Sequence, residues 1–396
     1  MFALGLSAGV LVLVGLFLRA FLFRVYRVDS GSMEPTLFGS AERGESVIVE
    51  FDDSTPERFE TIVLRGPGGA YVKRAVGLPG ERVELRHGDL VVDGRRLGPE
   101  VPRPLFPVLF DSRWHPIEDD FILGAQDQRP WTPGDSGLWL LDALEIPEGD
   151  RAGLLYFHRN ATDDYLDADH RIVRGQRVVN DLVVEADLRV VEVAAAGGIV
   201  RLGLHECADT FEATLRFSAE GDEVTASLTR RNRPDQLEVL AETRVTLPLN
   251  SWLKARFANV DDCLLLTLLV EGLDAGAGES GLGASYAGNV FASTDLRREG
   301  LSYVPRVHLG GEGVRLELAR LRIERDLYYT PRDRWGVEEP VQLGVDQLFV
   351  LGDNSAHSRD SREFGPVSIS DVVGRPHWVV WPWAVRRTLP EPRPLR

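Results

Sequence analysis

The stretch Asp29-Ser-Gly-Ser-Met-Glu-Pro-Thr-Leu37 lies between an apolar segment at the start of the chain and a series of short strand-like runs. Taken alone, Ser32 in this stretch is an ordinary turn serine, because Ser and Gly are common in turns. Its place directly after an apolar segment, and two distant stretches described below, give it a different meaning.

The apolar segment extends from Phe2 to Phe23 and contains one charged residue, Arg19. A helix of this length, rising about 1.5 Å per residue, can span a hydrocarbon core of roughly 30 Å. A cleaved secretory signal is disfavoured, because the segment has no basic start and no small-residue cleavage site follows it. The sequence therefore predicts a retained transmembrane anchor over residues 1–24.

The composition argues against several classes of function. The 61 acidic and 45 basic side chains give a net charge of -16, so a nucleic-acid partner is not expected. The two cysteines, Cys207 and Cys263, lack the spacing of a zinc site. We expect neither a metal nor a cofactor, and the two cysteines could equally form a disulfide or remain free thiols in a core.

Periodicity beyond the anchor predicts a mainly β protein in which one β region is split by another. Short strand-like runs separated by turns fill residues 25–97 and return in residues 326–396. Residues 98–176 are rich in Pro, Asp and Trp without a period, so we expect irregular structure there. Residues 177–325 predict an inserted antiparallel β-sandwich, and residues 252–272 resemble a hairpin of concanavalin-like jelly rolls.

Two further stretches complete a pattern with the Ser32 stretch. They are Tyr71-Val-Lys-Arg-Ala-Val-Gly-Leu-Pro-Gly80 and, far downstream, Phe349-Val-Leu-Gly-Asp-Asn-Ser355 with Ser358-Arg-Asp-Ser-Arg362. In order, content and distance from the apolar segment, the three together resemble the sequence boxes of bacterial type I signal peptidases, also called leader peptidases. The resemblance covers residues 18–97 and 327–396 and does not extend to the segment between them.

This resemblance implies a membrane-bound serine endopeptidase that removes signal peptides from exported preproteins through an acyl-enzyme. Ser32 is the expected nucleophile and Lys73 the expected general base. The residues themselves suit this chemistry, because a serine hydroxyl needs a base and burial can bring a lysine pKa towards neutrality. A lone strand lysine normally points to solvent, but Lys73 has apolar neighbours on both sides and two accompanying boxes.

The resemblance also assigns roles around the pair. The Ser32 N–H and the Ser30 hydroxyl would form the oxyanion hole. Ser358 would hydrogen-bond the Lys73 amine and orient it. Asp29 stands where the family usually has proline, but Ser30 and Ser32 remain in place, so activity is still expected.

Further residues of the boxes have supporting roles by the same resemblance. Asp360 and Arg362 would form an ion pair near the site, which Arg74 could join, while Asp353 and Asn354 would build a turn. The positions that line the shallow apolar substrate pockets match Tyr26, Val28, Met33, Leu37, Tyr71 and Val72. The substrate should therefore carry Ala or a similarly small residue at two positions before the cut.

The expected partners are the lipid bilayer and the signal peptides of exported preproteins, and the ligand or partner of the inserted region stays open. The resemblance implies a single-pass protein of the plasma membrane with its catalytic domain on the exoplasmic, periplasmic side. Arg19, Arg24 and Arg27 oppose this orientation, because basic residues favour the cytoplasmic side of a span.

The sequence leaves three other interpretations open. His357 lies within the third box, so a Ser-His-Asp triad is possible. A self-cleaving repressor-type protease would use the same Ser-Lys pair, but it needs a DNA-binding helical domain where this chain has an apolar segment. The third is an inactive peptidase scaffold whose inserted sandwich binds a glycan or a protein at the cell surface.

Overall fold

The computed structural model describes residues 23–66, 68–86, 88–97, 106–123, 130–149, 151–206, 209–219, 221–233, 236–271, 279–286, 307–382 and 387–389. Across these ranges the chain is mainly β with antiparallel sheets, which confirms that part of the predicted fold class. The predicted anchor, residues 1–24, falls almost entirely outside them. Within the described ranges no helix has the length and apolar character needed to cross a membrane.

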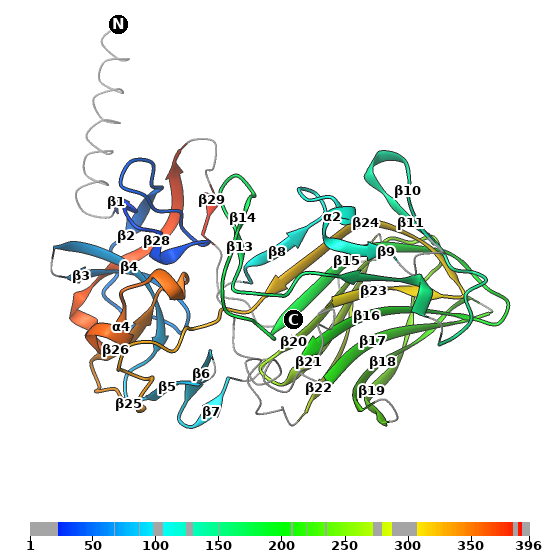
Figure 1. Ribbon diagram of the computed structural model, residues 1–396. Helices are drawn as coiled ribbons and strands as arrows, with labels where there is room; N and C mark the ends of the chain where they lie inside the picture. The colour runs from blue at the N-terminus through cyan, green and yellow to red at the C-terminus, as the bar shows by residue number, and fades with distance from the viewer. Residues whose placement is uncertain are drawn as a thin grey trace, which may run out of the picture.

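Figure 1 shows two β bodies side by side, one built from both ends of the chain and one from its middle. We call them the terminal body, residues 23–97 and 327–389, and the insertion, residues 106–326. The short helical elements are η1 (Gly31–Met33), α2 (Ile117–Asp120), η2 (Asp135–Gly137), η3 (Arg151–Gly153), η4 (Ser355–His357), α4 (Ser361–Phe364) and η5 (Ile369–Asp371).

The terminal body has one eight-stranded sheet whose strands come from both ends of the chain. In spatial order they are β1 (Phe23–Arg27), β2 (Ser46–Glu50), β28 (Val372–Trp381), β3 (Thr61–Gly66), β4 (Gly69–Gly77), β26 (Gln347–Leu351) and β27 (Val367–Ser368), with β29 (Arg387–Thr388) beside β28. A four-stranded sheet also joins the two ends through β25 (Val341–Gln342), β5 (Arg82–Arg86), β6 (Asp89–Val92) and β7 (Arg95–Arg96). Neither sheet can form from one end alone.

Strand β3 shows why the larger of these sheets is stable. Val63 packs into one apolar cluster with Val47 and Val379, whereas Ile62 and Leu64 pack into another. A strand that is buried on both faces reads as a continuous apolar run, as Ile62-Val-Leu64 does.

The insertion is a sandwich of two antiparallel sheets. One sheet contains β10 (Trp131–Pro133), β11 (Trp139–Asp142), β24 (Val314–Arg325), β15 (Leu182–Val193), β20 (Leu253–Val260), β21 (Cys263–Val270) and β22 (Glu279–Ser285), with β8 (Val108–Asp111) paired to β24. The other contains β19 (Gln236–Thr246), β18 (Gly221–Arg233), β17 (Asp209–Ser218), β16 (Gly198–Glu206), β23 (Val307–Glu312), β12 (Leu154–Phe157) and β9 (Phe121–Leu123). Alternate residues such as Leu182, Val184 and Val200 fill one core between them.

The segment 98–176 differs from the sequence prediction of irregular structure. β8, β10 and β11 extend one sheet of the sandwich, and β9 and β12 extend the other. These strands have three or four residues each, too few to produce a recognisable alternation among prolines and aspartates. A two-stranded hairpin, β13 (Tyr165–Leu166) and β14 (Ile172–Val173), stands apart from both sheets.

A buried polar network lies on the face of the second sheet that points away from the core. The His308 ring packs over Gly203, its register partner on β16, and its Nε2 is 2.9 Å from Glu212 Oε1 on the next strand. His308 Nδ1 is also 3.2 Å from His205 Nε2. Gly203 is required here, because a Cβ at this position would lie 1.9 Å from the His308 ring.

We therefore expect Gly203→Ala to lower the free energy of unfolding by about 1–3 kcal/mol, the usual cost of an overpacked site. Gly281→Ala on β22 is the matched control, because its new methyl group would meet only Leu266 O, 4.0 Å away. Urea unfolding of both variants measures the difference. Equal stability of the two variants would contradict the packing of His308 against Gly203.

Candidate active site

Ser32 and Lys73 meet in the terminal body. Ser32 is the middle residue of the turn η1, which begins directly after the extended residue Ser30. Lys73 lies on β4 opposite Ile62 of β3. Lys73 Nζ donates a hydrogen bond to Ser32 Oγ at 2.7 Å, and both residues are buried. The two residues that the sequence pattern paired are thus in direct contact.

The surroundings of Lys73 shift its protonation equilibrium towards the neutral amine. Burial lowers the pKa of Lys73 to about 8, although the carboxylates of Asp360 and Asp353 oppose the shift and Arg362 assists it. A lysine with this pKa exists partly as the free amine close to neutral pH, so it can accept a proton. The charge state suited to a general base is accessible to this side chain.

The predicted oxyanion residue Ser30 lies beside Ser32. Its Oγ donates to Ser32 Oγ at 3.3 Å, and its side chain is exposed. Ser358 is fully buried, and its Oγ has no hydrogen-bond partner among the described residues. A Cβ on Gly352 would lie 2.2 Å from Ser358 Oγ and 2.4 Å from the Ser32 carbonyl oxygen, so this glycine lets Ser358 approach the Ser32 turn.

Two buried ion pairs flank the site. Arg362 Nη2 donates to Asp360 Oδ2 at 2.7 Å, and neither side chain is exposed to solvent. Arg74 does not join this pair, contrary to the sequence interpretation. Its Nε donates to Asp353 Oδ1 at 2.7 Å, and this second pair is equally buried. Asp353 is therefore more than a turn residue.

The neighbouring Asn354 holds the Ser32 turn. Its backbone N–H donates to the Ser32 carbonyl oxygen at 3.1 Å, and its Nδ2 donates to the Gly31 carbonyl oxygen at 3.0 Å. Sequence reasoning missed this function, and the only signal was the position of Asn354 in the third box. His357 lies nearby, but its Nδ1 is 3.2 Å from Asn354 Oδ1, and among the described residues no contact with Ser32 is found.

Most residues predicted to line substrate pockets gather at one apolar cluster beside Ser32. Val28, Met33 and Leu37 are buried members of it, and Tyr26 and Val72 pack at its edge. Tyr71 lies apart from this cluster, half exposed and against Gly66. Met33 and Leu37 are too deeply buried to touch a peptide as the site stands, so they would support a pocket from beneath.

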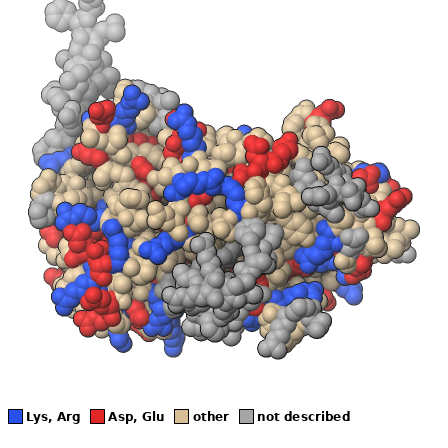
Figure 2. Space-filling model, in the orientation of Figure 1, with Lys and Arg blue, Asp and Glu red and all other residues tan. Residues whose placement is uncertain are grey.

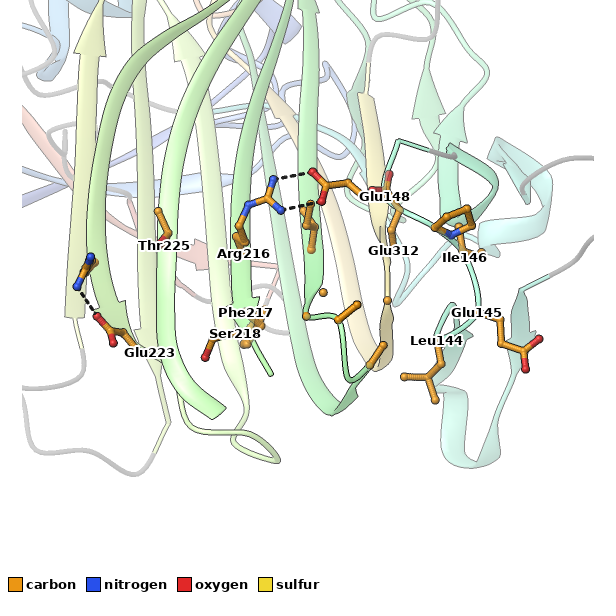
Figure 3. A pocket seen from close by; sticks show the side chains of 18 residues that line it. Leu144, Glu145, Ile146, Glu148, Arg216, Phe217, Ser218, Glu223, Thr225 and Glu312 are labelled. Atoms are coloured by element: carbon orange, nitrogen blue, oxygen red, sulfur yellow. Dashed lines mark hydrogen bonds and ion pairs between the residues drawn. The ribbon is translucent and has the colours of Figure 1, made fainter. Parts of the chain in front are cut away.

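Other polar features lie away from this site. A hollow of about 530 Å³ is found at the end of the insertion, where the Arg216 and Glu148 side chains face one another (Figure 3). On the face seen in Figure 2, acidic and basic side chains are interspersed over both bodies. Cys263 is half buried with Sγ 3.5 Å from Ser285 Oγ, while Cys207 lies outside the described residues.

One group of carboxylates among the described residues has the spacing of a metal site. Oxygen atoms of Asp89, Asp181 and Asp261 lie within 4.8 Å of one another where the insertion meets the terminal body. Burial, followed by the repulsion between these groups, raises the pKa of Asp89 and of Asp181 well above the usual range. Arg96, whose Nη2 is 3.2 Å from Asp89 Oδ2, compensates part of the negative charge of the cluster.

Parts of the chain resemble known proteins of one peptidase family. A family model described as "Signal peptidase, peptidase S26" matches residues 1–131 and 290–381. Signal peptidase I of Bacillus amyloliquefaciens is 36% identical over 86 residues, which cover 22% of this chain and 46% of that protein. Signal peptidase I of Bacillus caldolyticus is 36% identical over 110 residues, covering 27% of this chain and 57% of that protein.

The chain belongs to this peptidase family, which confirms the resemblance found in the sequence. It spans about half the length of the curated relatives it matches. Among solved structures, the CBM2 module of the evolved Dit of Lactobacillus casei BL23 phage J-1 aligns at 13% identity and a TM-score of 0.36, over 56% of this chain and 96% of that chain. A similarity at this level carries no inference about the insertion.

The buried amine should cost stability. Below a folded pKa of about 8, Lys73 is protonated in both the folded and the unfolded chain, so the burial penalty applies in full there and disappears as the pH rises towards 10.5. Lys73→Met removes the charge and keeps an apolar stem. We expect its free energy of unfolding below neutral pH to rise by about 2 kcal/mol, after allowing for the lost hydrogen bond.

Chemical denaturation of the variant and of wild type measures this gain. Lys254→Met is the control. Burial lowers the pKa of Lys254, but Asp187 and Glu185 raise it by more, so replacing Lys254 should not stabilise the protein. A Lys73→Met variant less stable than wild type would contradict an unfavourable buried ammonium.

Proposed function

We propose that the protein is a membrane-bound serine endopeptidase that removes signal peptides from exported preproteins, with Ser32 as nucleophile and Lys73 as general base. The observation that carries the proposal is the 2.7 Å contact between Lys73 Nζ and Ser32 Oγ in a buried site. The relatives that the chain matches are called signal peptidase I, which supports the substrate class.

In the first half of the reaction, the neutral Lys73 amine accepts the Ser32 hydroxyl proton while Oγ attacks the scissile carbonyl carbon. The carbonyl oxygen becomes an oxyanion, which accepts hydrogen bonds from the Ser32 N–H and the Ser30 hydroxyl. As the C–N bond breaks, the Lys73 ammonium returns the proton to the leaving amine. The mature protein departs with a free N-terminus, and the signal peptide remains as an ester on Ser32.

In the second half, Lys73 takes a proton from water, and the resulting hydroxide equivalent attacks the ester carbonyl. Collapse of this intermediate returns the proton to Ser32 Oγ and releases the signal peptide as a carboxylate. The buried Ser358 hydroxyl is available to orient the amine when it turns away from Ser32. The Asp360–Arg362 pair supports the chain around Ser358.

The substrate would lie against the apolar cluster next to Ser32. Tyr26 and Val72 border this cluster and Tyr71 stands on the same strand as Lys73, which suits a small side chain such as Ala before the cut. In this proposal residues 1–24 anchor the protein in the plasma membrane as a single span. The catalytic domain faces the exoplasmic side, where exported precursors present their cleavage sites.

The roles of the pair are tested by substitution in the full chain. Ser32→Ala should abolish cleavage of a model preprotein, because it removes the nucleophile. Lys73→Arg should abolish cleavage as well, because a guanidinium is not deprotonated in proteins and cannot act as the base. Lys254→Arg is the matched control on the insertion and should retain wild-type kcat/KM. Substantial cleavage by folded Lys73→Arg would rule out the lysine base.

The pH dependence provides a separate test. Since the free amine is the active form, kcat/KM should rise with pH and reach half its limit at about 8, the pKa of Lys73. A histidine base would instead give a midpoint of about 6.5. Rates measured across this range should keep the higher midpoint in His357→Gln. Loss of both the rise and the turnover in that variant would favour the Ser-His-Asp alternative.

A further inference from the structure

The insertion reaches the turn that carries Ser32. Glu34 follows this turn, and its backbone N–H donates to the Gly31 carbonyl oxygen at 3.2 Å. The Glu34 carboxylate lies over Gly31. A Cβ on that glycine would be only 3.0 Å from Glu34 Oε1. The hydroxyl of Tyr165, in the hairpin β13–β14, donates a hydrogen bond to Glu34 Oε2 at 2.5 Å.

The Ser32 turn is therefore held from two bodies. Asn354 of the terminal body binds the carbonyl oxygens of Gly31 and Ser32, and Tyr165 of the insertion binds the side chain of Glu34. We propose that Tyr165 is a positioning residue, which fixes the Glu34 end of the Ser32 turn and so makes the insertion part of the catalytic structure. This inference rests on the proposed function of Ser32.

Tyr165 is itself rigidly placed. It is buried, and its hairpin is fixed at Asp164, whose Oδ1 accepts from Gly175 N at 2.7 Å. The Asp164 carbonyl oxygen accepts from Arg325 Nε at 2.8 Å. Arg325 is the last residue of β24, so an interior strand of the sandwich holds the hairpin that holds the Ser32 turn.

Tyr165 and Arg325 each keep one protonation state near neutral pH. Burial, and then the hydrogen bond to Glu34, raise the pKa of Tyr165 above its usual value, so its hydroxyl remains a donor throughout the working range of the enzyme. Burial lowers the pKa of Arg325 to about 10, which still leaves it charged near neutral pH. The contact should therefore position Ser32 without changing the titration of Lys73.

Tyr165→Phe tests the proposal by removing one oxygen atom and keeping the ring. We expect kcat to fall about tenfold, as for loss of a hydrogen bond to a charged group, with KM and the midpoint of the pH profile unchanged. Tyr156→Phe is the matched control. It also removes a tyrosine hydroxyl, but that hydroxyl bonds Arg151 inside the insertion. It should leave kcat at the wild-type value.

A double-mutant cycle shows whether the effect passes through Glu34. Glu34→Ala should be about as slow as Tyr165→Phe, and combining the two should cost no more than either alone. Glu34→Gln keeps an acceptor oxygen, so it should lose less activity than Glu34→Ala. An undiminished effect of Tyr165→Phe in the Glu34→Ala background would overturn the proposal.

Hydrogen exchange of the full chain in detergent gives a readout independent of cleavage. In Tyr165→Phe, amides of residues 31–37 should exchange faster while those of the sandwich strands do not change. Wild-type exchange there, or faster exchange with unchanged kcat, would overturn the positioning role. A wild-type enzyme that cleaves no preprotein would instead refute the proposed function, and exchange would still show whether Tyr165 holds the turn.

Discussion

The loss of water around the Lys73 amine is the constraint on which the rest of the terminal body depends. Burial disfavours the ammonium, and the carboxylates of Asp360 and Asp353 oppose this effect only in part. Each of these carboxylates is bound by its own buried arginine, Arg74 or Arg362, which compensates the negative charge. Arg362 also acts on Lys73 itself and, together with burial, keeps the pKa of Lys73 at about 8.

The topology explains how so large an insertion is tolerated and why it is not a detached module. Leu97 and Leu327, where the chain leaves and re-enters the terminal body, belong to the same buried cluster, so the ends of the insertion are already close. Yet Arg96 donates to Asp262 at 2.7 Å, and Tyr165 donates to Glu34. The sandwich is therefore bonded directly to the body that it interrupts.

Sequence reasoning succeeded where a pattern is local or where several boxes agree. The alternation of Leu182-Val-Val-Glu-Ala-Asp-Leu188 predicted a sandwich strand, and three boxes together predicted that Ser32 meets Lys73. It failed where the outcome depends on distant partners. Nothing near Asp353 indicates that it pairs with Arg74, 279 residues earlier, and a strand as short as β8 can be recognised only once it is seen paired with a long neighbour such as β24. The Tyr165–Glu34 contact has the same origin.

The pKa of Lys73 tests the central claim most directly, and the composition makes it measurable, because Lys73 and Lys254 are the only lysines in the sequence. In protein labelled with ¹³C at lysine Cε, NMR titration should give two resonances, and Lys254→Arg should leave one. The account predicts that the remaining resonance titrates with a pKa of about 8, well below the ordinary 10.5. A pKa at or above the ordinary value would mean that the amine stays protonated beside Ser32, and the lysine base would be wrong.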